Sequence, residues 1–230
     1  MRKFDFAEGE FYHVYNRGVD KRNVFGSAHD LDRFFLSMQE FNSLVPIGSL
    51  YEKSFNKKQP KGQTSKSEKR KKSLVNFIAY CLNPNHYHFI LEQVAESGVE
   101  KFMQRLGTGY TKYFNIKNKR TGSLFQGTFK AVHVDSNEYL LHLSAYVNLN
   151  NRVHQLGSLA SKLVEDRSSW GEYVGNASAG NHICKSNIIL EQFKTKNEYK
   201  DFAEDALSGI LQRKIEFAET ERYLLEELGS

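Results

Sequence analysis

The stretch from Leu74 to Val94 restricts the possible folds of this chain more than any other. Leu74 to Leu82 is an almost continuous apolar run, and His86 to Val94 follows it after the sequence Asn83-Pro84-Asn85. A short apolar run beside turn residues is typical of a buried strand, and Asn and Pro favour tight turns. The stretch therefore predicts two neighbouring antiparallel strands joined by a short turn.

Other segments add to this strand pair. Aromatic and β-branched residues predict strands near 11–16 and 129–134. The spacing of apolar residues predicts one helix over 31–44, a second that begins after Ser97 and a third over 136–150. Ser97 and Glu100 have the spacing of a capping box for the second helix, and Ser136 is the expected cap of the third. Helices are also expected near 187–206 and 208–228. The fold class expected is α+β, an antiparallel sheet with helices packed on it.

Composition excludes some classes of protein. With 230 residues, of which 40% are hydrophobic and 13% aromatic, the chain has enough apolar material for a globular core plus an appendage. It contains no apolar run near the roughly 20 residues that span a bilayer, so no membrane partner is expected. Its start lacks the apolar stretch of a secretory signal, and its two cysteines form no CxxC pattern, so we expect a cytoplasmic protein.

Positive charge is concentrated in two places. Residues 52–72 hold nine Lys or Arg and two Glu, whereas residues 101–134 hold seven Lys or Arg and no acidic residue. Separated basic segments of this kind suit a polyanion such as nucleic acid. The segment 52–72 is equally compatible with a solvated insertion.

A pair of histidines lies on the second predicted strand of the pair. Side chains two residues apart on a strand point to the same face, so His86 and His88 would lie together while Tyr87 points away. Two neutral imidazoles can supply part of a divalent-metal site. On spacing alone, such a pair is most often two ordinary half-buried histidines.

Tyr146 and Asn150 are four residues apart on the helix predicted over 136–150, and hence share a face. A tyrosine phenol is a possible nucleophile once deprotonated, and an amide oxygen is an acceptable ligand for Mg²⁺ or Mn²⁺. Taken singly, Tyr146 would be read as packing and Asn150 as a helix-terminating cap. Together with His86 and His88 they suggest metal-assisted chemistry on phosphate.

Beyond these local patterns, the chain resembles the single-tyrosine HUH transposases, and within them the REP-associated tyrosine transposases (IS200-like). The resemblance covers roughly residues 8–173 and rests on five ordered motifs. These are Tyr12-His13-Val14-Tyr15-Asn16-Arg17-Gly18, the stretch Asn83 to Leu91, the stretch Leu106 to Asn115, the stretch Gly122 to Lys130, and Tyr146-Val147-Asn148-Leu149-Asn150.

This resemblance implies a ferredoxin-like sheet and metal-dependent cleavage of single-stranded DNA, often folded as a hairpin. Tyr146 would attack the scissile phosphate and hold a 5′-phosphotyrosine, while His86, His88 and Asn150 would bind Mg²⁺ or Mn²⁺. Basic residues expected to contact DNA are Arg17, Lys112, Lys119, Arg120 and Lys130. Relatives of this kind work as monomers or as homodimers, and both stay open.

The resemblance also implies a division of the chain. Residues 1–155 would form the catalytic domain, with 52–72 as a basic insertion, and 156–230 a largely helical C-terminal extension. Two departures from the family pattern are Tyr87, where an aliphatic residue is more usual, and Asn151, where proline is common.

Three alternatives stay open at this point. Tyr110 and Tyr113, on a basic amphipathic helix, are rival nucleophiles. A domesticated protein that binds hairpin DNA without chemistry would belong to a different functional class. A metal-dependent nuclease that uses water would leave Tyr146 with a structural role.

Overall fold

The computed structural model describes residues 4–47, 50, 72–153, 167–175 and 182–228. The predicted basic insertion at 52–72 therefore lies almost entirely outside the described residues. The strands are β1 (Phe11–Arg17), β2 (Val75–Asn83), β3 (His86–Gln93) and β4 (Lys130–Val134). The longer helices are α1 (Ala28–Phe41), α3 (Gly98–Lys117), α4 (Asn137–Asn148) and α9 (Lys196–Leu228). The short ones are η1 (Val19–Lys21), α5 (Asn150–Val153), α7 (Trp170–Val174) and α8 (Asn187–Leu190).

The four strands form one antiparallel sheet in the order β2-β3-β1-β4. Along the chain, α1 connects β1 to β2 and α3 connects β3 to β4, which is the βαββαβ arrangement of a ferredoxin-like fold. The predicted α+β class is thus confirmed. The β2–β3 turn has only Pro84 and Asn85 between the paired residues Asn83 and His86, as the turn sequence predicted.

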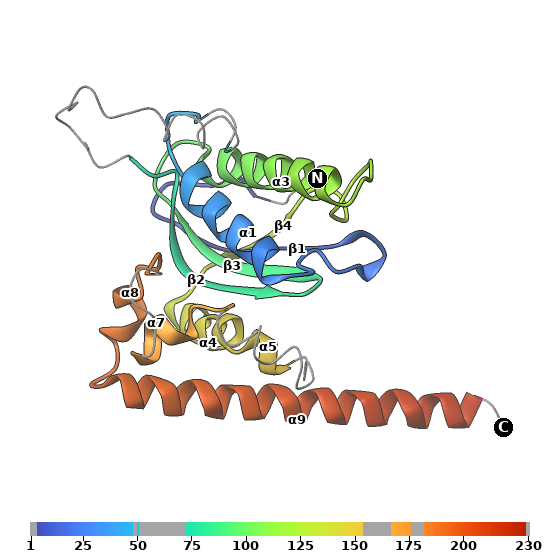
Figure 1. Cartoon of the computed structure of the whole chain (residues 1–230). Coiled ribbons are helices and arrows are strands. Elements are labelled where there is room, and N and C mark those ends of the chain that lie inside the picture. Colours follow the sequence, from blue (N-terminus) through green and yellow to red (C-terminus); the bar gives the residue numbers. More distant parts are fainter. Residues whose placement is uncertain (1–3, 48–49, 51–71, 154–166, 176–181, 229–230) are drawn as a thin grey trace, which may run out of the picture.

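Helices cover both faces of the sheet (Figure 1). On one side α1 and α3 pack on a core that includes Tyr87, Phe89 and Leu91 of β3. On the other side α4 and the C-terminal helices pack on a core that includes Ile90. Because alternate residues of a strand point to opposite faces, β3 contributes to both cores, which explains its nearly continuous burial.

The C-terminal helices belong to this second core. Tyr199 of α9 is fully buried against α4, and its hydroxyl accepts a hydrogen bond of 2.9 Å from Nδ2 of Asn148. Farther along, α9 extends past α4 and α5 toward the C-terminus (Figure 1). It is one continuous helix from Lys196, so the predicted pair of helices at 187–206 and 208–228 was wrong.

Two local predictions also need correction. The helix predicted over 136–150 ends at Asn148, because Leu149 adopts φ −107° and ψ 12°, and Asn150 begins α5. The capping box at Ser97 does not form, because Ser97 has a left-handed backbone (φ 53°) and its side chain makes no cap hydrogen bond. The Ser136 cap is confirmed, since its Oγ accepts from the Tyr139 amide at 3.2 Å.

No helix in the described ranges is long and apolar enough to cross a membrane. Cys81 and Cys184 are both free thiols.

Candidate active site

His86 and His88 lie on the face of β3 that looks toward α4. Their ring centroids are 5.2 Å apart, and both side chains are largely buried. Tyr87 points to the opposite face, where it stacks on Phe89 with a centroid distance of 4.7 Å. The shared orientation of the two imidazoles, predicted from their spacing, is therefore confirmed.

The hydrogen bonds of His86 determine which of its nitrogens carries a proton. Nδ1 lies 2.6 Å from Oδ1 of Asn85, and the Asn85 amide is oriented by donating from Nδ2 to the Lys21 carbonyl at 3.1 Å. Nδ1 is therefore the donor, which leaves a lone pair on Nε2. Nε2 lies 3.2 Å from Oδ1 of Asn150, and Asn83 Nδ2 lies within 3.0 Å of both atoms. The Asn83 amide nitrogen thus holds two electron-pair donors, His86 Nε2 and Asn150 Oδ1, next to each other.

His88 is held by a third histidine, which the sequence did not single out. Nδ1 of His88 lies 2.9 Å from Nε2 of His13 on β1, and the two rings stack at 5.1 Å. Burial lowers the pKa of His13 to about 4, so this imidazole is neutral at neutral pH. One proton then lies between the two nitrogens, and His13 fixes the ring plane and tautomer of His88.

Tyr146 projects from α4 onto the histidines. Its ring meets the ring of His88 edge-on at a centroid distance of 5.6 Å and that of His13 at 6.2 Å. Burial raises the pKa of Tyr146, and the Asn150 amide and the Arg17 charge lower it in part. The phenol is therefore neutral at neutral pH and must lose its proton before it can act as a strong nucleophile.

Asn150 stays close to Tyr146 although it lies in the next helix. The amide of Leu149 still donates to the Ala145 carbonyl at 3.0 Å, so the last turn of α4 carries the chain directly into α5. Asn150 is fully buried, and its Oδ1 accepts from Asn83 at 2.6 Å instead of capping α4. Among the described residues its Nδ2 has no hydrogen-bond partner.

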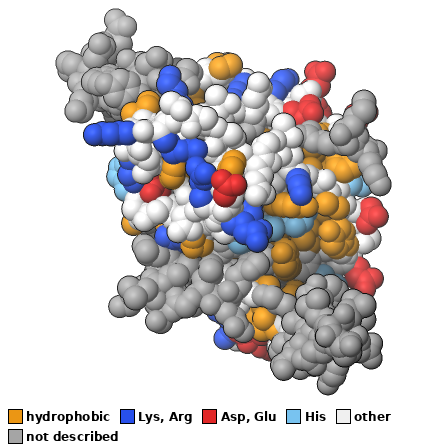
Figure 2. All heavy atoms as spheres, turned by 90° about the vertical axis from the view of Figure 1, so that its right-hand side faces the viewer, with side chains coloured by type: hydrophobic (Ala, Val, Ile, Leu, Met, Phe, Trp, Pro, Cys, Tyr) orange, Lys and Arg blue, Asp and Glu red, His pale blue; other side chains and the backbone are white. Residues whose placement is uncertain are grey.

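Two of the five predicted DNA-contacting residues lie on this same face. Arg17 pairs with His86 across β1 and β3, and Lys130 pairs with Tyr15, which in turn pairs with His88. Directly paired residues of antiparallel strands project from the same face. Figure 2 shows histidine side chains at this end of the molecule, with hydrophobic and basic side chains around them.

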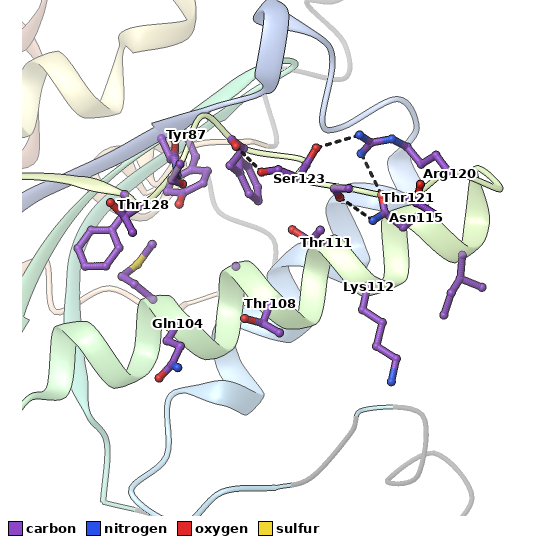
Figure 3. Close-up of a pocket in the computed structure, with 18 of the residues that line it drawn as sticks. Tyr87, Gln104, Thr108, Thr111, Lys112, Asn115, Arg120, Thr121, Ser123 and Thr128 are labelled. Carbon is purple, nitrogen blue, oxygen red and sulfur yellow. Dashed lines mark hydrogen bonds between the residues drawn. The ribbon is translucent and has the colours of Figure 1, made fainter.

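The other three, Lys112, Lys119 and Arg120, lie elsewhere. They line a groove beside α3, on the opposite face of the sheet (Figure 3). The structure therefore does not bring them together with the histidines. The guanidinium of Arg120 donates to Oδ1 of Asn115 and to the Ser123 carbonyl, both at 2.9 Å, so it holds this loop in place.

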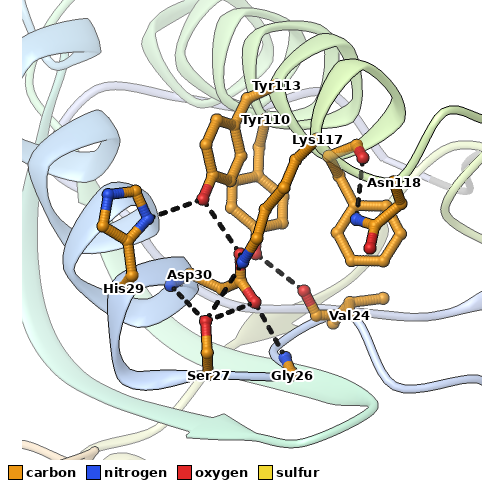
Figure 4. A network of polar contacts seen from close by, with 10 residues as sticks. Val24, Gly26, Ser27, His29, Asp30, Tyr110, Tyr113, Lys117 and Asn118 are labelled. Atoms are coloured by element: carbon orange, nitrogen blue, oxygen red, sulfur yellow. Dashed lines mark hydrogen bonds and ion pairs between the residues drawn. The ribbon is translucent and has the colours of Figure 1, made fainter.

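The rival tyrosines also lie on the α3 side of the sheet. The hydroxyl of Tyr110 is buried and donates to the Val24 carbonyl at 2.7 Å, and burial raises its pKa. The hydroxyl of Tyr113 donates to Asp30 at 2.9 Å and contacts His29 (Figure 4). Both hydroxyls are therefore engaged in hydrogen bonds on the face of the sheet opposite His86 and His88.

A metal at this site would have few possible ligands. Within the described ranges no three His, Cys, Asp or Glu side chains are grouped so that they could hold an ion. The groups that would hold an ion here are the two imidazoles of His86 and His88 and the amide oxygen of Asn150. Such a mixed nitrogen and oxygen set suits a divalent ion such as Mn²⁺ or Mg²⁺ and leaves positions open for water or phosphate.

Comparison with known proteins gives one match at the level of a family. The family model described as "Transposase IS200 like" matches residues 51–150. No curated protein is similar enough to count as a match. Twelve chains of solved structures match. One of them, described as "Structure of the REP associates tyrosine transposase bound to a REP hairpin", has a TM-score of 0.46 and 10% identity. That match covers 81% of this chain and 95% of the solved chain.

Proposed function

Because residues 51–150 match the model of the IS200-like transposase family, we propose that this protein cuts and rejoins single-stranded DNA through a covalent bond to Tyr146. The observation that carries this proposal is the position of the Tyr146 ring, 5.6 Å from that of His88 and beside Asn150. A nucleophile adjoining two imidazoles and an amide oxygen is a suitable arrangement for metal-assisted phosphoryl transfer.

In the proposed reaction the Tyr146 phenol loses its proton and its oxygen attacks the scissile phosphorus. The bond from phosphorus to the 3′ oxygen breaks, which leaves a 5′-phosphotyrosine and a 3′-hydroxyl. A divalent ion bound by His86, His88 and Asn150 would polarise the phosphate. A second strand's 3′-hydroxyl then attacks the phosphotyrosine and regenerates the phenol.

The surrounding residues would orient the DNA and the reacting groups. Arg17, opposite His86, and Lys130, opposite Tyr15, provide positive charge for the phosphates on either side of the cleaved bond. His13 and Asn83 hold His88 and Asn150 in place. Since the chain's own tyrosine adjoins its own histidines, a single copy contains all the proposed catalytic groups.

The proposed substrate is hairpin DNA with a single-stranded flank, and the proposed location is the cytoplasm, where the two free cysteines would stay reduced. The test incubates labelled hairpin DNA with the protein and Mg²⁺ or Mn²⁺, and separates the products on a denaturing gel. A protein-linked product is expected, and it should disappear in Tyr146→Phe.

Tyr139→Phe is the matched control, because Tyr139 is an exposed tyrosine on the same helix. Survival of the adduct in Tyr146→Phe would overturn the assignment of the nucleophile. Free ends without a protein-linked product would indicate a nuclease that uses water. Hairpin binding without any cleavage would indicate a binding protein without chemistry.

A further inference from the structure

A groove runs between α3 and the segment 119–129 on the face of the sheet opposite the histidines. It encloses a volume of about 960 Å³. Figure 3 shows α3 along one side of it, with Thr121, Ser123 and Thr128 on the other. The nicking site proposed above does not use this groove.

The groove combines an apolar floor with polar walls. Tyr87, Met103 and Phe125 lie at its base and are each no more than 5% exposed, while the more accessible Phe129 and Ile116 add apolar surface to its lining. The polar lining residues include Gln104, Thr108, Thr111, Thr121 and Thr128. Within the described part of the chain, no side-chain hydrogen bond is formed by any of these five. Their donors and acceptors are therefore available to a ligand that also has a flat apolar surface.

The far wall of the groove is fixed to α3. Asn115 on α3 donates from Nδ2 to the Gly122 carbonyl at 2.9 Å, and its Oδ1 accepts from Arg120 at 2.9 Å. Arg120 also donates to the Ser123 carbonyl, and Ser123 Oγ donates to the Phe125 carbonyl at 2.6 Å. These bonds, drawn in Figure 3, hold the groove open in the free protein.

The charge of the groove suits a phosphate-bearing ligand. Its lining includes Lys112, Lys119 and Arg120 and no acidic residue. Arg120 is occupied by the loop, but Lys112 and Lys119 make no ion pair with any described residue. The sequence from 101 to 134 is free of acidic residues, and Glu100, in the first turn of α3, does not line the groove.

The groove and the histidine site lie back to back at one end of the sheet. Asn16 and Tyr87 line the groove, while their chain neighbours Arg17, His86 and His88 face the other side. The Asn16 side chain donates to the Gly127 carbonyl at 3.2 Å, which ties β1 to the groove wall. A DNA strand that ran out of the groove past β4 would meet Lys130, which lies on the histidine face.

We propose that this groove binds a short stretch of unpaired DNA next to the cleaved phosphate and thereby selects the sequence to be cut. The volume lies within the roughly 300–1,000 Å³ of small-ligand sites, so it accepts one or a few nucleotides and no duplex. Bases reach an apolar floor only when they are unpaired, and lysines at the rim would contact their phosphates. This inference rests on the proposed function.

Gly107 offers a direct test, because it lines the groove and a Cβ placed there would meet no atom within 4 Å. Gly107→Leu should therefore fill the groove without disturbing α3, since leucine also favours a helix over glycine. Gly209→Leu is the matched control, a helical glycine with equally open space on α9. Thermal melting checks that both variants fold.

The measurement is the Kd for two fluorescent hairpins, one with a short single-stranded flank of mixed sequence and one blunt. Gly107→Leu should weaken binding of the flanked hairpin by about tenfold, the effect of losing about one stacked base, and leave blunt binding unchanged. Equal affinity of Gly107→Leu and the wild type for the flanked hairpin would overturn the proposal. An equal loss for both hairpins would overturn it as well.

A charge variant tests the proposal independently. Lys112→Gln should reduce the salt dependence of flanked-hairpin binding by about 0.7 in the slope of log K against log salt. Lys101→Gln, on the same helix but bonded to the Glu96 carbonyl at 2.9 Å, should leave the slope unchanged. Equal salt slopes for Lys112→Gln and Lys101→Gln would contradict the binding of DNA in the groove. If the wild type forms no covalent adduct but Gly107→Leu still discriminates between the hairpins, the proposed function fails and the groove assignment stands.

Discussion

His13 and His88, 75 residues apart in the chain, place two ring nitrogens 2.9 Å from each other. The contact joins β1 to β3 directly behind Tyr146, whose ring meets both imidazoles edge-on. A second imidazole that fixes the tautomer and plane of a metal-binding histidine is a common means of tuning such a site. His13 therefore acts, in our proposal, as a positioning residue for His88.

His13→Leu should raise the Mn²⁺ concentration needed for half-maximal adduct formation by about 10- to 100-fold. Adduct formation at saturating Mn²⁺ should recover, because the proposed ligands and Tyr146 are still present. His13→Gln retains an amide that can reach His88, so it should restore part of the metal response. His133→Leu is the control, since His133 is only partly buried, contacts Glu10 at 2.8 Å and pairs with Tyr12 on the other face of the sheet. Identical metal titrations for His13→Leu and the wild type would mean that His13 only packs in the core and does not position His88.

Lys130→Gln should weaken the binding of single-stranded DNA. Lys130 is exposed at the start of β4, on the face that carries His88, and is expected to contact one phosphate. Losing one such contact lowers the salt slope of binding by about 0.7. The slope is measured by titrating labelled DNA at several salt concentrations. Lys185→Gln is the comparison, because Lys185 is exposed next to the β2 residue Phe77, far along that strand from Asn83. An unchanged salt slope of DNA binding in Lys130→Gln would mean that Lys130 does not contact the DNA.

Asp30 should contribute to stability in a pH-dependent way. Burial by itself would raise the pKa of Asp30, but hydrogen bonds from Lys117, Ser27 and Tyr113 and the charge of Lys117 hold it below its ordinary value (Figure 4). The unfolded chain therefore takes up this proton at a higher pH than the folded protein does. The stabilisation is complete above the unfolded-state pKa of about 3.9 and is lost as the pH falls through the lower folded-state pKa.

Asp30→Asn should accordingly lower the free energy of unfolding at pH 7 by about 1–3 kcal/mol, because it removes the charge from a buried hydrogen-bonded group. The difference from the wild type should narrow below about pH 4. Urea unfolding of both proteins at several pH values measures this difference in the free energy of unfolding. Asp32→Asn, at an exposed position of the same helix, should change little. A difference that stays constant in acid would contradict the role of the Asp30 charge.

Local patterns in the sequence were sufficient to predict the strands and the shared orientation of His86 and His88. A strand has a period of two, so the alternation of His86, Tyr87 and His88 determines which side chains share a face. The register between strands is set by contacts distant in the chain. For this reason the sequence did not indicate that His13 meets His88 or that Arg17 lies opposite His86.

The basic residues show the same limit. Lys112 and Lys130 belong to one acid-free segment, and composition predicted a shared DNA role for both. In the fold they lie on opposite faces of the sheet. Lys112 is on α3, which packs on one face, whereas the side chain of Lys130 projects from the other face, as that of its partner Tyr15 does. Asn83 was read only as a turn residue, although its amide donates to Asn150 at 2.6 Å. Spacing alone does not distinguish a turn former from a residue that also orients a site.

The start of α3 gives the clearest case in which a local motif misleads. Ser97 and Glu100 have the spacing of a capping box, yet the Val99 amide donates to the side chain of Gln93 at 3.1 Å. Gln93 is 1% exposed, and its Nε2 also donates to the Phe6 carbonyl at 3.2 Å. Gln93→Ala should therefore lower the free energy of unfolding by about 1–3 kcal/mol, the cost of leaving buried polar groups unpaired. Ser97→Ala should change it by less than about 0.5 kcal/mol, as for a position without a special role. A true cap would lose about 0.5–2 kcal/mol in Ser97→Ala, so urea unfolding of the two variants decides which residue begins the helix.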